Sequence, residues 1–267
     1  MINNNIVLFD MDGTLTEPRG DFDTELFLSL RKLSKYAEIG IVTGSDMNYI
    51  EDQLLKLMKF SELRFKLHIL PCNGTKYYKP PKYPQDDFVL SFEKDMAQEL
   101  SYVCLREIFK IITKFQSDAC YTEIPLAGHF VSYRGSMINW CPIGRKASSE
   151  QRSVFVEYDK LNKFRDRVLH NLRSKINLKC PNKVVIKKGG ETSFDIYPVG
   201  WDKTYALKHF KDKTCWFVGD RCEPSGNDYE IYNTLAPLGR AFQTSNTIQT
   251  GWIIENEIIP KLKGENK

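Results

Sequence analysis

The sequence is poor in the residues and runs that mark zinc proteins, secreted proteins and membrane proteins. It has four histidines among 267 residues, and none of its seven cysteines stands in a C-x-x-C pair, which argues against a zinc site and a disulfide framework. No apolar run approaches the roughly 20 residues of a membrane-spanning helix. The first residues, MINNNIVLFD, do not resemble a signal peptide. We therefore expect a soluble protein of the reducing cytoplasm, with oxygen ligands for any metal.

The charge is also nearly balanced. There are 38 lysines and arginines against 34 aspartates and glutamates, and 42% of the residues are hydrophobic. A nucleic-acid binder would more often show a basic run with interleaved aromatic residues, and the sequence has none. The composition is that of a globular protein with a sizeable core, and its partners are expected to be small molecules rather than nucleic acid or membrane.

Short apolar runs alternate with amphipathic helical segments at both ends of the chain, which is the pattern of a parallel sheet with crossover helices. The middle instead groups helical stretches with hairpin-like strands. The proline-rich stretch KPPKYPQDD marks the first change of pattern. The predicted fold class is α/β, with a discontinuous parallel-sheet core over residues 1–85 and 198–267. An inserted α+β domain with an antiparallel sheet is expected over residues 86–197.

The stretch IVLFDMDGTLT delivers two carboxylates to the end of a buried strand. Asp10 and Asp12 follow the apolar run, and Gly13 permits a tight turn. An acid and a glycine can simply close a turn. A nucleophilic carboxylate that attacks phosphorus forms an aspartyl phosphate, and it needs a neighbouring acid/base and a cation.

A second acidic stretch, GDRCEPSGNDYE, follows the strand predicted over residues 214–218. Asp220 occupies the same strand-end position as Asp10, and with Asp12 these acids offer oxygen ligands for Mg²⁺. Asn227 and Asp228 lie at a predicted helix start. They either cap that helix or stand behind the metal ligands.

These motifs together resemble the haloacid dehalogenase superfamily of phosphotransferases. The matching pieces are DMDGTLT, the strand ending in TGSD, Lys203, and GD…ND. The resemblance implies a Rossmann-like core. It makes Asp10 the nucleophile, Asp12 the general acid/base and a metal ligand, and Asp220 a magnesium ligand. It also implies that Ser45, or alternatively Thr43, holds the transferring phosphoryl group while Lys203 stabilises its charge.

The inserted region narrows the resemblance. The segments YRGSMINWCPIGRKASSEQR and GGETSFDIYPVGWDK are similar to the eukaryotic phosphomannomutase family. The family pattern implies a set of sugar-phosphate ligands, in which an arginine matches phosphate with a planar fork. The other interpretation of these arginines is solvated surface charge. The implied ligands are Arg19, Arg134, Arg145, Arg152, Ser193 and Asp195.

The resemblance implies a magnesium-dependent enzyme that interconverts mannose 1-phosphate and mannose 6-phosphate and so supplies GDP-mannose synthesis. A hexose 1,6-bisphosphate would act as intermediate and activator, and the protein would be a homodimer through the inserted domain. A sugar-phosphate phosphatase remains the nearest alternative, since it shares the core acids but needs no arginine set. A non-catalytic sugar-phosphate-binding protein would lack Asp10 or Asp220, and both are present.

Overall fold

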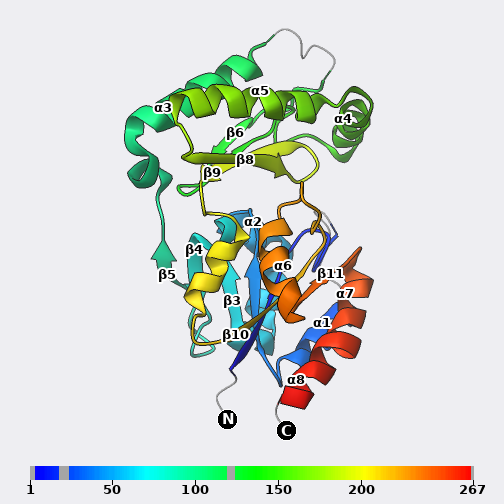
Figure 1. Cartoon of the computed structure of the whole chain (residues 1–267). Coiled ribbons are helices and arrows are strands. Elements are labelled where there is room, and N and C mark those ends of the chain that lie inside the picture. The colour runs from blue at the N-terminus through cyan, green and yellow to red at the C-terminus, as the bar shows by residue number, and fades with distance from the viewer. Residues whose placement is uncertain (1–3, 18–23, 119–123, 266–267) are drawn as a thin grey trace. The chain divides into compact units, whose positions relative to one another are not determined.

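The computed structural model describes residues 4–17, 24–118 and 124–265. The chain divides into two compact units, which we call the core unit (Met1–Glu93 with Trp201–Lys267) and the inserted unit (Lys94–Gly200). Figure 1 shows the elements of each unit. The sequence assigned residues 86–93 to the insertion, but strand β5 (Val89–Glu93) pairs with β4 (Lys76–Lys79) in the sheet of the core unit. The proline-rich stretch lies in the connection between these two strands rather than between units.

The core unit is built on a seven-stranded sheet in the order β11-β10-β1-β2-β3-β4-β5. Strand β1 lies between β10 and β2 and is parallel to both, and β11 and β3 extend the parallel part. The edge made by β4 and β5 is antiparallel, so the sheet is mixed. The parallel strands are β1 (Asn5–Phe9), β2 (Glu38–Val42), β3 (Leu67–Leu70), β10 (Thr214–Gly219) and β11 (Ala241–Gln243).

Strand β1 is apolar from Ile6 to Phe9 because helices cover both faces of the sheet. Val7 and Phe9 belong to one apolar cluster, and Ile6 and Leu8 belong to another, as the period of two in a strand requires. The first cluster packs against α1 (Thr24–Leu33), α2 (Met47–Phe60), α7 (Thr247–Ile253) and α8 (Ile259–Glu265). The second packs against the 3₁₀ helix η4 (Lys203–His209) and α6 (Tyr229–Leu235).

Short helical turns complete the core unit. Segment η4 is a 3₁₀ helix, and α6 begins at Tyr229, two residues after the predicted helix start at Asn227. The remaining turns are η1 (Glu62–Lys66), η2 (Cys72–Gly74), η5 (Ala236–Leu238) and the π-helical turn η6 (Ile254–Ile258).

The inserted unit is an antiparallel sheet in the order β6-β7-β9-β8, with α3 and α5 along one face (Figure 1). On that face Trp140 stacks on Phe194 at 5.1 Å between ring centroids and lies 6.2 Å from Phe115 of α3. The predicted strand at residues 119–123 lies outside the described residues. The elements are α3 (Met96–Gln116), β6 (Val131–Tyr133), β7 (Ile138–Trp140), α4 (Ser149–Asn162), α5 (Phe164–Lys179), β8 (Val184–Gly189) and β9 (Ser193–Pro198).

A disulfide joins Cys104 of α3 to Cys180 at the end of α5. The expectation that the chain has no disulfide is therefore wrong for this pair. The two residues are 76 apart in sequence, and only the packing of α3 beside α5 brings them together. Because disulfides persist mainly in oxidising compartments, this bond does not support the expected reducing compartment. In the described part of the chain, no helix is long and apolar enough to cross a membrane.

The disulfide predicts a measurable contribution to stability. It closes a long loop, so replacing both cysteines (C104A/C180A) should lower the free energy of unfolding by about 3 kcal/mol. Urea unfolding without reductant measures this difference. Adding a reductant should bring the wild type down to the variant and leave the variant unchanged. Equal midpoints for the two proteins under oxidising conditions would contradict the prediction.

Candidate functional site

Three neighbouring strands end at the same edge of the core sheet and bring the predicted acids together. Asp10 follows β1, Asp220 follows β10, and Thr43 follows β2. Because β1 lies between β10 and β2 in parallel register, these three positions meet at the carboxyl edge of the sheet. That edge is where α/β sheets bind their ligands.

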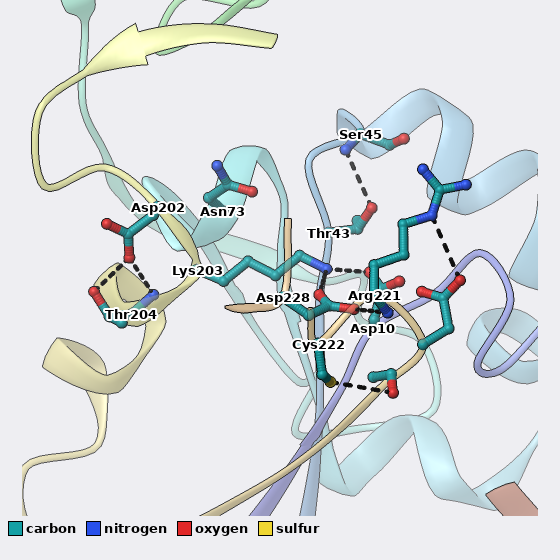
Figure 2. Close-up of polar contacts among 12 residues, drawn as sticks. Asp10, Thr43, Ser45, Asn73, Asp202, Lys203, Thr204, Arg221, Cys222 and Asp228 are labelled. Atoms are coloured by element: carbon teal, nitrogen blue, oxygen red, sulfur yellow. Dashed lines mark hydrogen bonds and ion pairs between the residues drawn. The ribbon is translucent and has the colours of Figure 1, made fainter. Parts of the chain in front are cut away.

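Lys203 forms ion pairs with two acids of the site, Asp10 and Asp228. It is fully buried, and its Nζ forms ion pairs with Asp10 Oδ1 and, at 2.5 Å, with Asp228 Oδ1 (Figure 2). Burial alone would lower the pKa of Lys203, but the two carboxylates raise it above its ordinary value. Lys203 is therefore protonated, and its charge is fixed beside Asp10. Asp202 caps the start of η4 by accepting from the Thr204 main-chain N–H at 2.9 Å.

Three carboxylates form a cluster at this edge. Asp10, Asp220 and Asp228 each offer an oxygen atom, and these atoms lie within 4.8 Å of one another. Burial, followed by the charge of Asp228, raises the pKa of Asp10 well above its usual range and also raises the pKa of Asp220. Burial and the neighbouring carboxylate thus both disfavour the ionised forms of Asp10 and Asp220.

The donor atoms of the cluster fit a divalent cation. Asp220 Oδ1 and Asn227 Oδ1 are buried and have no hydrogen-bond partner among the described residues. An unpaired buried oxygen is unfavourable, and a hard cation such as Mg²⁺ prefers carboxylate and amide oxygens. The crowded acids and these two oxygens therefore make a site that a cation would stabilise.

The approach of the two acidic loops requires glycine. Gly13 has a φ of +84°, and a Cβ there would lie 2.5 Å from Asp220 Oδ2. In the second loop a Cβ on Gly226 would lie 1.9 Å from the Arg221 carbonyl oxygen. A side chain at Gly13 would push the two loops apart, and one at Gly226 would distort the second loop. The glycines of DMDG and SGND are therefore needed for the acids to meet.

Asp12 lies next to the cluster but takes no part in it through its carboxylate. The Tyr49 hydroxyl of α2 donates to Asp12 Oδ1 at 3.0 Å. The sequence placed Asp12 among the metal-binding carboxylates and Asp228 behind them, whereas the described cluster contains Asp228. Asp228 is not the simple helix cap of the alternative interpretation, since its side chain caps no helix and instead binds Lys203 and the Arg221 main-chain N–H, at 3.0 Å.

The turn after β2 carries both residues considered for the phosphoryl group. The Ser45 main-chain N–H donates to Thr43 Oγ1 at 3.2 Å (Figure 2). The Asn73 N–H donates to the Thr43 carbonyl oxygen at 2.8 Å. Thr43 is buried, whereas Ser45 is half-buried. The Thr43 hydroxyl thus orders the turn, and the Ser45 side chain is the more accessible of the two.

In the inserted unit, three of the predicted substrate ligands meet around one amide. Asn139 of β7 accepts from Arg145 Nη1 at 3.1 Å and donates to Ser193 Oγ at 2.9 Å and to Asp195 Oδ1 at 2.8 Å. Asn139 lies directly opposite Asp195 in the pairing of β7 with β9. The structure therefore brings Arg145, Ser193 and Asp195 into one polar network.

Two other predicted arginines have different partners. Arg152 follows a capping box of Ser148 and Gln151 at the start of α4, and its Nη1 donates to Thr192 Oγ1 at 3.2 Å. Arg134 is buried after β6, and its main-chain N–H donates to the Met137 carbonyl oxygen at 2.8 Å. Arg19 lies outside the described residues.

Comparison with known proteins decides the family. Residues 26–255 match the model of the family described as eukaryotic phosphomannomutase. The chain belongs to the eukaryotic phosphomannomutase family. It is 35% identical over 236 residues to a phosphomannomutase of Encephalitozoon cuniculi, covering 85% of this chain and 84% of that one. It is 34% identical over 253 residues to the Drosophila melanogaster phosphomannomutase, covering 91% and 92%.

Solved structures support the fold. An IMP-nucleotidase of Plasmodium falciparum superposes with a TM-score of 0.63 over 97% of this chain and 72% of that chain, at 16% identity. At this identity the likeness concerns the fold alone. The predicted membership of the eukaryotic phosphomannomutase family and the predicted α/β class, with a haloacid dehalogenase-like core and a separate antiparallel sheet, are confirmed.

Two residues of the site were missed by sequence reasoning. Asn139 is a polar residue between Ile138 and Trp140 in a predicted strand, and this alternation could have pointed to it. Tyr49 reaches Asp12 from the first turns of α2, and no motif of the family as quoted from the sequence includes it.

The crowding of the three acids predicts opposite effects of Asp220→Asn with and without metal. Removing one of three neighbouring negative charges should leave the cation-free variant at least as thermally stable as the wild type. Magnesium should stabilise the wild type by about 2.7 kcal/mol at a hundredfold excess over its dissociation constant, and the variant by far less. Thermal unfolding with and without MgCl₂ measures both effects.

The control is Asp212→Asn, which removes an exposed acid of the same unit. It should keep the full magnesium-induced shift. An undiminished magnesium shift in the Asp220 variant would show that this carboxylate does not bind the cation.

Proposed function

We propose that this member of the family interconverts α-D-mannose 1-phosphate and D-mannose 6-phosphate by way of a phosphoaspartate on Asp10. In one half-reaction a phosphorylated Asp10 passes its phosphoryl group to a hydroxyl of the sugar monophosphate, giving a hexose 1,6-bisphosphate. In the other half-reaction Asp10 attacks the second phosphate of that bisphosphate and releases the isomeric monophosphate. A trace of hexose 1,6-bisphosphate would prime the cycle, and the product mannose 1-phosphate would supply GDP-mannose synthesis.

The observation that supports this proposal best is the setting of Asp10. Its carboxylate is 4% exposed, pairs with the buried Lys203, and lies beside Asp220 and Asp228. A buried nucleophilic carboxylate next to a fixed positive charge and a cation site is suited to attack on a phosphoryl group, whose oxygens are negative. Family membership makes sugar phosphates the substrates.

Asp12 suits the role of general acid/base. It lies two residues after the proposed nucleophile Asp10, and the 3.0 Å hydrogen bond from Tyr49 orients its carboxylate. In the proposed cycle it takes the proton from the attacking sugar hydroxyl and returns a proton to the leaving oxygen. Tyr49 fixes one carboxylate oxygen of Asp12, which favours transfer through the other.

Magnesium would be held by Asp10, Asp220 and Asp228, with Asn227 close by. Asp12 also belongs to our proposed ligand set, through its main-chain oxygen, so that its carboxylate stays available for proton transfer. When bound, the cation would neutralise charge on the transferring phosphoryl oxygens. Lys203 contributes a second positive charge from the chain itself. Its two ion pairs prevent that charge from moving away from Asp10.

The inserted unit would recognise the rest of the substrate. Arg145 and Arg152, with Arg134 and Arg19, would bind the phosphate that is not transferred, and Ser193 and Asp195 would contact the sugar. Arginine clusters are well suited to phosphate, whereas a carboxylate accepts from sugar hydroxyls. We also propose that the protein is a homodimer through the inserted unit. Tyr102 and Val103 of α3, both more than 70% exposed, offer an apolar surface there.

Phosphorus NMR tests the proposed function directly. The protein is incubated with MgCl₂, mannose 1-phosphate and a trace of glucose 1,6-bisphosphate. Growth of the mannose 6-phosphate signal is the expected result. A signal of inorganic phosphate without the isomer would instead indicate a sugar-phosphate phosphatase, and an unchanged spectrum would contradict both activities.

Replacing the nucleophile gives the matching prediction. Asp10→Asn should reduce turnover by at least about 10³-fold, since the amide cannot form the phosphoaspartate. The fold should remain, because Lys203 keeps its ion pair with Asp228 and one crowded negative charge is removed. Turnover by the NMR assay and circular dichroism spectra check the two halves. Activity near that of the wild type would exclude Asp10 as nucleophile.

A further inference from the structure

We propose that Asn139 is a positioning residue that sets the geometry of the sugar-phosphate site before substrate binds. The inference rests on the proposed function, since it explains how three of the proposed ligands are held. Asn139 lies in the middle of β7, is 3% exposed, and faces Asp195 across the strand pair. Neither the family motifs nor the proposed reaction assigns it a role.

The side-chain amide of Asn139 uses both of its ends. Its carbonyl oxygen accepts from Arg145 Nη1 at 3.1 Å. Its NH₂ group donates one hydrogen to Ser193 Oγ at 2.9 Å and the other to Asp195 Oδ1 at 2.8 Å. One buried group thus binds a cation, a hydroxyl and an anion at the same time.

The chemistry of the partners fixes the orientation of this amide. A guanidinium has only donors, and an ionised carboxylate has only acceptors. The oxygen must therefore face Arg145, and the nitrogen must face Asp195. Asparagine is suited to the position because it joins an acceptor to two donors on a short side chain. An aspartate would lose the donors, and a leucine would lose all three bonds.

Ser193 and Asp195 are confined from a second side. The Ser193 hydroxyl donates to the Gly189 carbonyl oxygen at 2.6 Å, so towards Asn139 it acts as an acceptor. A Cβ on Gly189 would lie 2.5 Å from Asp195 Oδ2, so the carboxylate lies directly against the main chain of β8. Asn139 and Gly189 therefore leave Asp195 little freedom, which reduces the entropy lost when substrate binds.

This arrangement keeps the proposed phosphate ligand, Arg145, apart from the proposed sugar ligand, Asp195. Opposite charges such as Arg145 and Asp195 attract, and a direct ion pair would occupy both groups. The amide instead takes one hydrogen bond from the arginine and gives another to the carboxylate. Arg145 is thereby kept for phosphate and Asp195 for sugar hydroxyls, which is the pattern of a hexose phosphate. The side chain of Asn139 itself need not touch the substrate.

The test compares Asn139→Leu with the wild type in the full chain. The KM for mannose 1-phosphate should rise about tenfold or more, while kcat at saturating substrate changes less than threefold. The magnesium-induced shift in melting temperature, measured with MgCl₂ alone, should be unchanged because it reports on the core unit. Asn171→Leu is the matched control, an exposed asparagine of α5 in the same unit, and it should leave KM and kcat unchanged.

Asn139→Asp keeps the test decisive if the leucine variant does not fold. It retains an acceptor for Arg145 but places a carboxylate beside Asp195. Near pH 8 its KM should be raised at least tenfold. Towards pH 5.5 the KM should fall back, because a proton shared by the two carboxylates restores a donor. The wild type should not show this pH dependence.

The outcomes separate this inference from the proposed function. A wild type that interconverts the sugar phosphates, with both Asn139 variants within twofold of its KM, would overturn the positioning role and leave the function intact. A rise in KM accompanied by loss of the magnesium-induced shift would indicate general damage and would also overturn the role. A wild type without interconversion would overturn the proposed function and with it this inference.

Discussion

The arrangement of the core site depends on the ion pairs of Lys203 with Asp10 and Asp228. They join the end of β1 to the start of η4 and to the loop before α6, across 193 and 25 residues of sequence. A buried charge left without any partner is strongly destabilising, so Lys203 requires at least one of its two carboxylates in place. The two clusters of apolar residues on either side of β1 hold these segments where the pairs can form. The proposed nucleophile, the lysine charge beside it and the candidate cation site thus depend on the same contacts.

In the inserted unit, the packing of the sheet determines where its polar side chains lie. Its helices bury one face of an antiparallel sheet around Trp140 and Phe194, which leaves alternate residues of β7 and β9 for the other face. The polar network around Asn139 is built from those alternate residues. Apolar packing therefore determines the register, and the register determines which polar groups meet. In the proposed function, Ser193 and Asp195 of β9 are thus positioned by the sheet, and Arg145 joins them from the turn after β7.

The parallel strands of the core and the acids at their ends could be predicted from the sequence, because each apolar run leads directly into its acidic residues. The apolar run into DMDG predicts a buried strand with acids at its end, and GD after the run at residues 214–218 predicts the neighbouring strand. What could not be predicted depends on pairing between distant segments. The role of Asp228 depends on Lys203 reaching it, the Cys104–Cys180 bond depends on α3 packing beside α5, and β5 joins the core sheet only because β4 is there to pair with it. Asn139 had a visible signal in its alternation, but its three partners are distant in sequence or lie beyond the strand.

The position of β10 beside β1 also has a consequence for synthesis. The first strand emerges from the ribosome early, yet its neighbour on one side is encoded more than 200 residues later, with Asn5 opposite Thr214. The inserted unit, from Lys94 to Gly200, is complete before that partner exists and can fold first. During this interval one edge of β1 is unpaired, and the apolar residues that later pack against β10, η4 and α6 are exposed to solvent. At this stage of synthesis the inserted unit is complete, while the core sheet still lacks β10 and the acids that follow it. Binding by chaperones would matter most then.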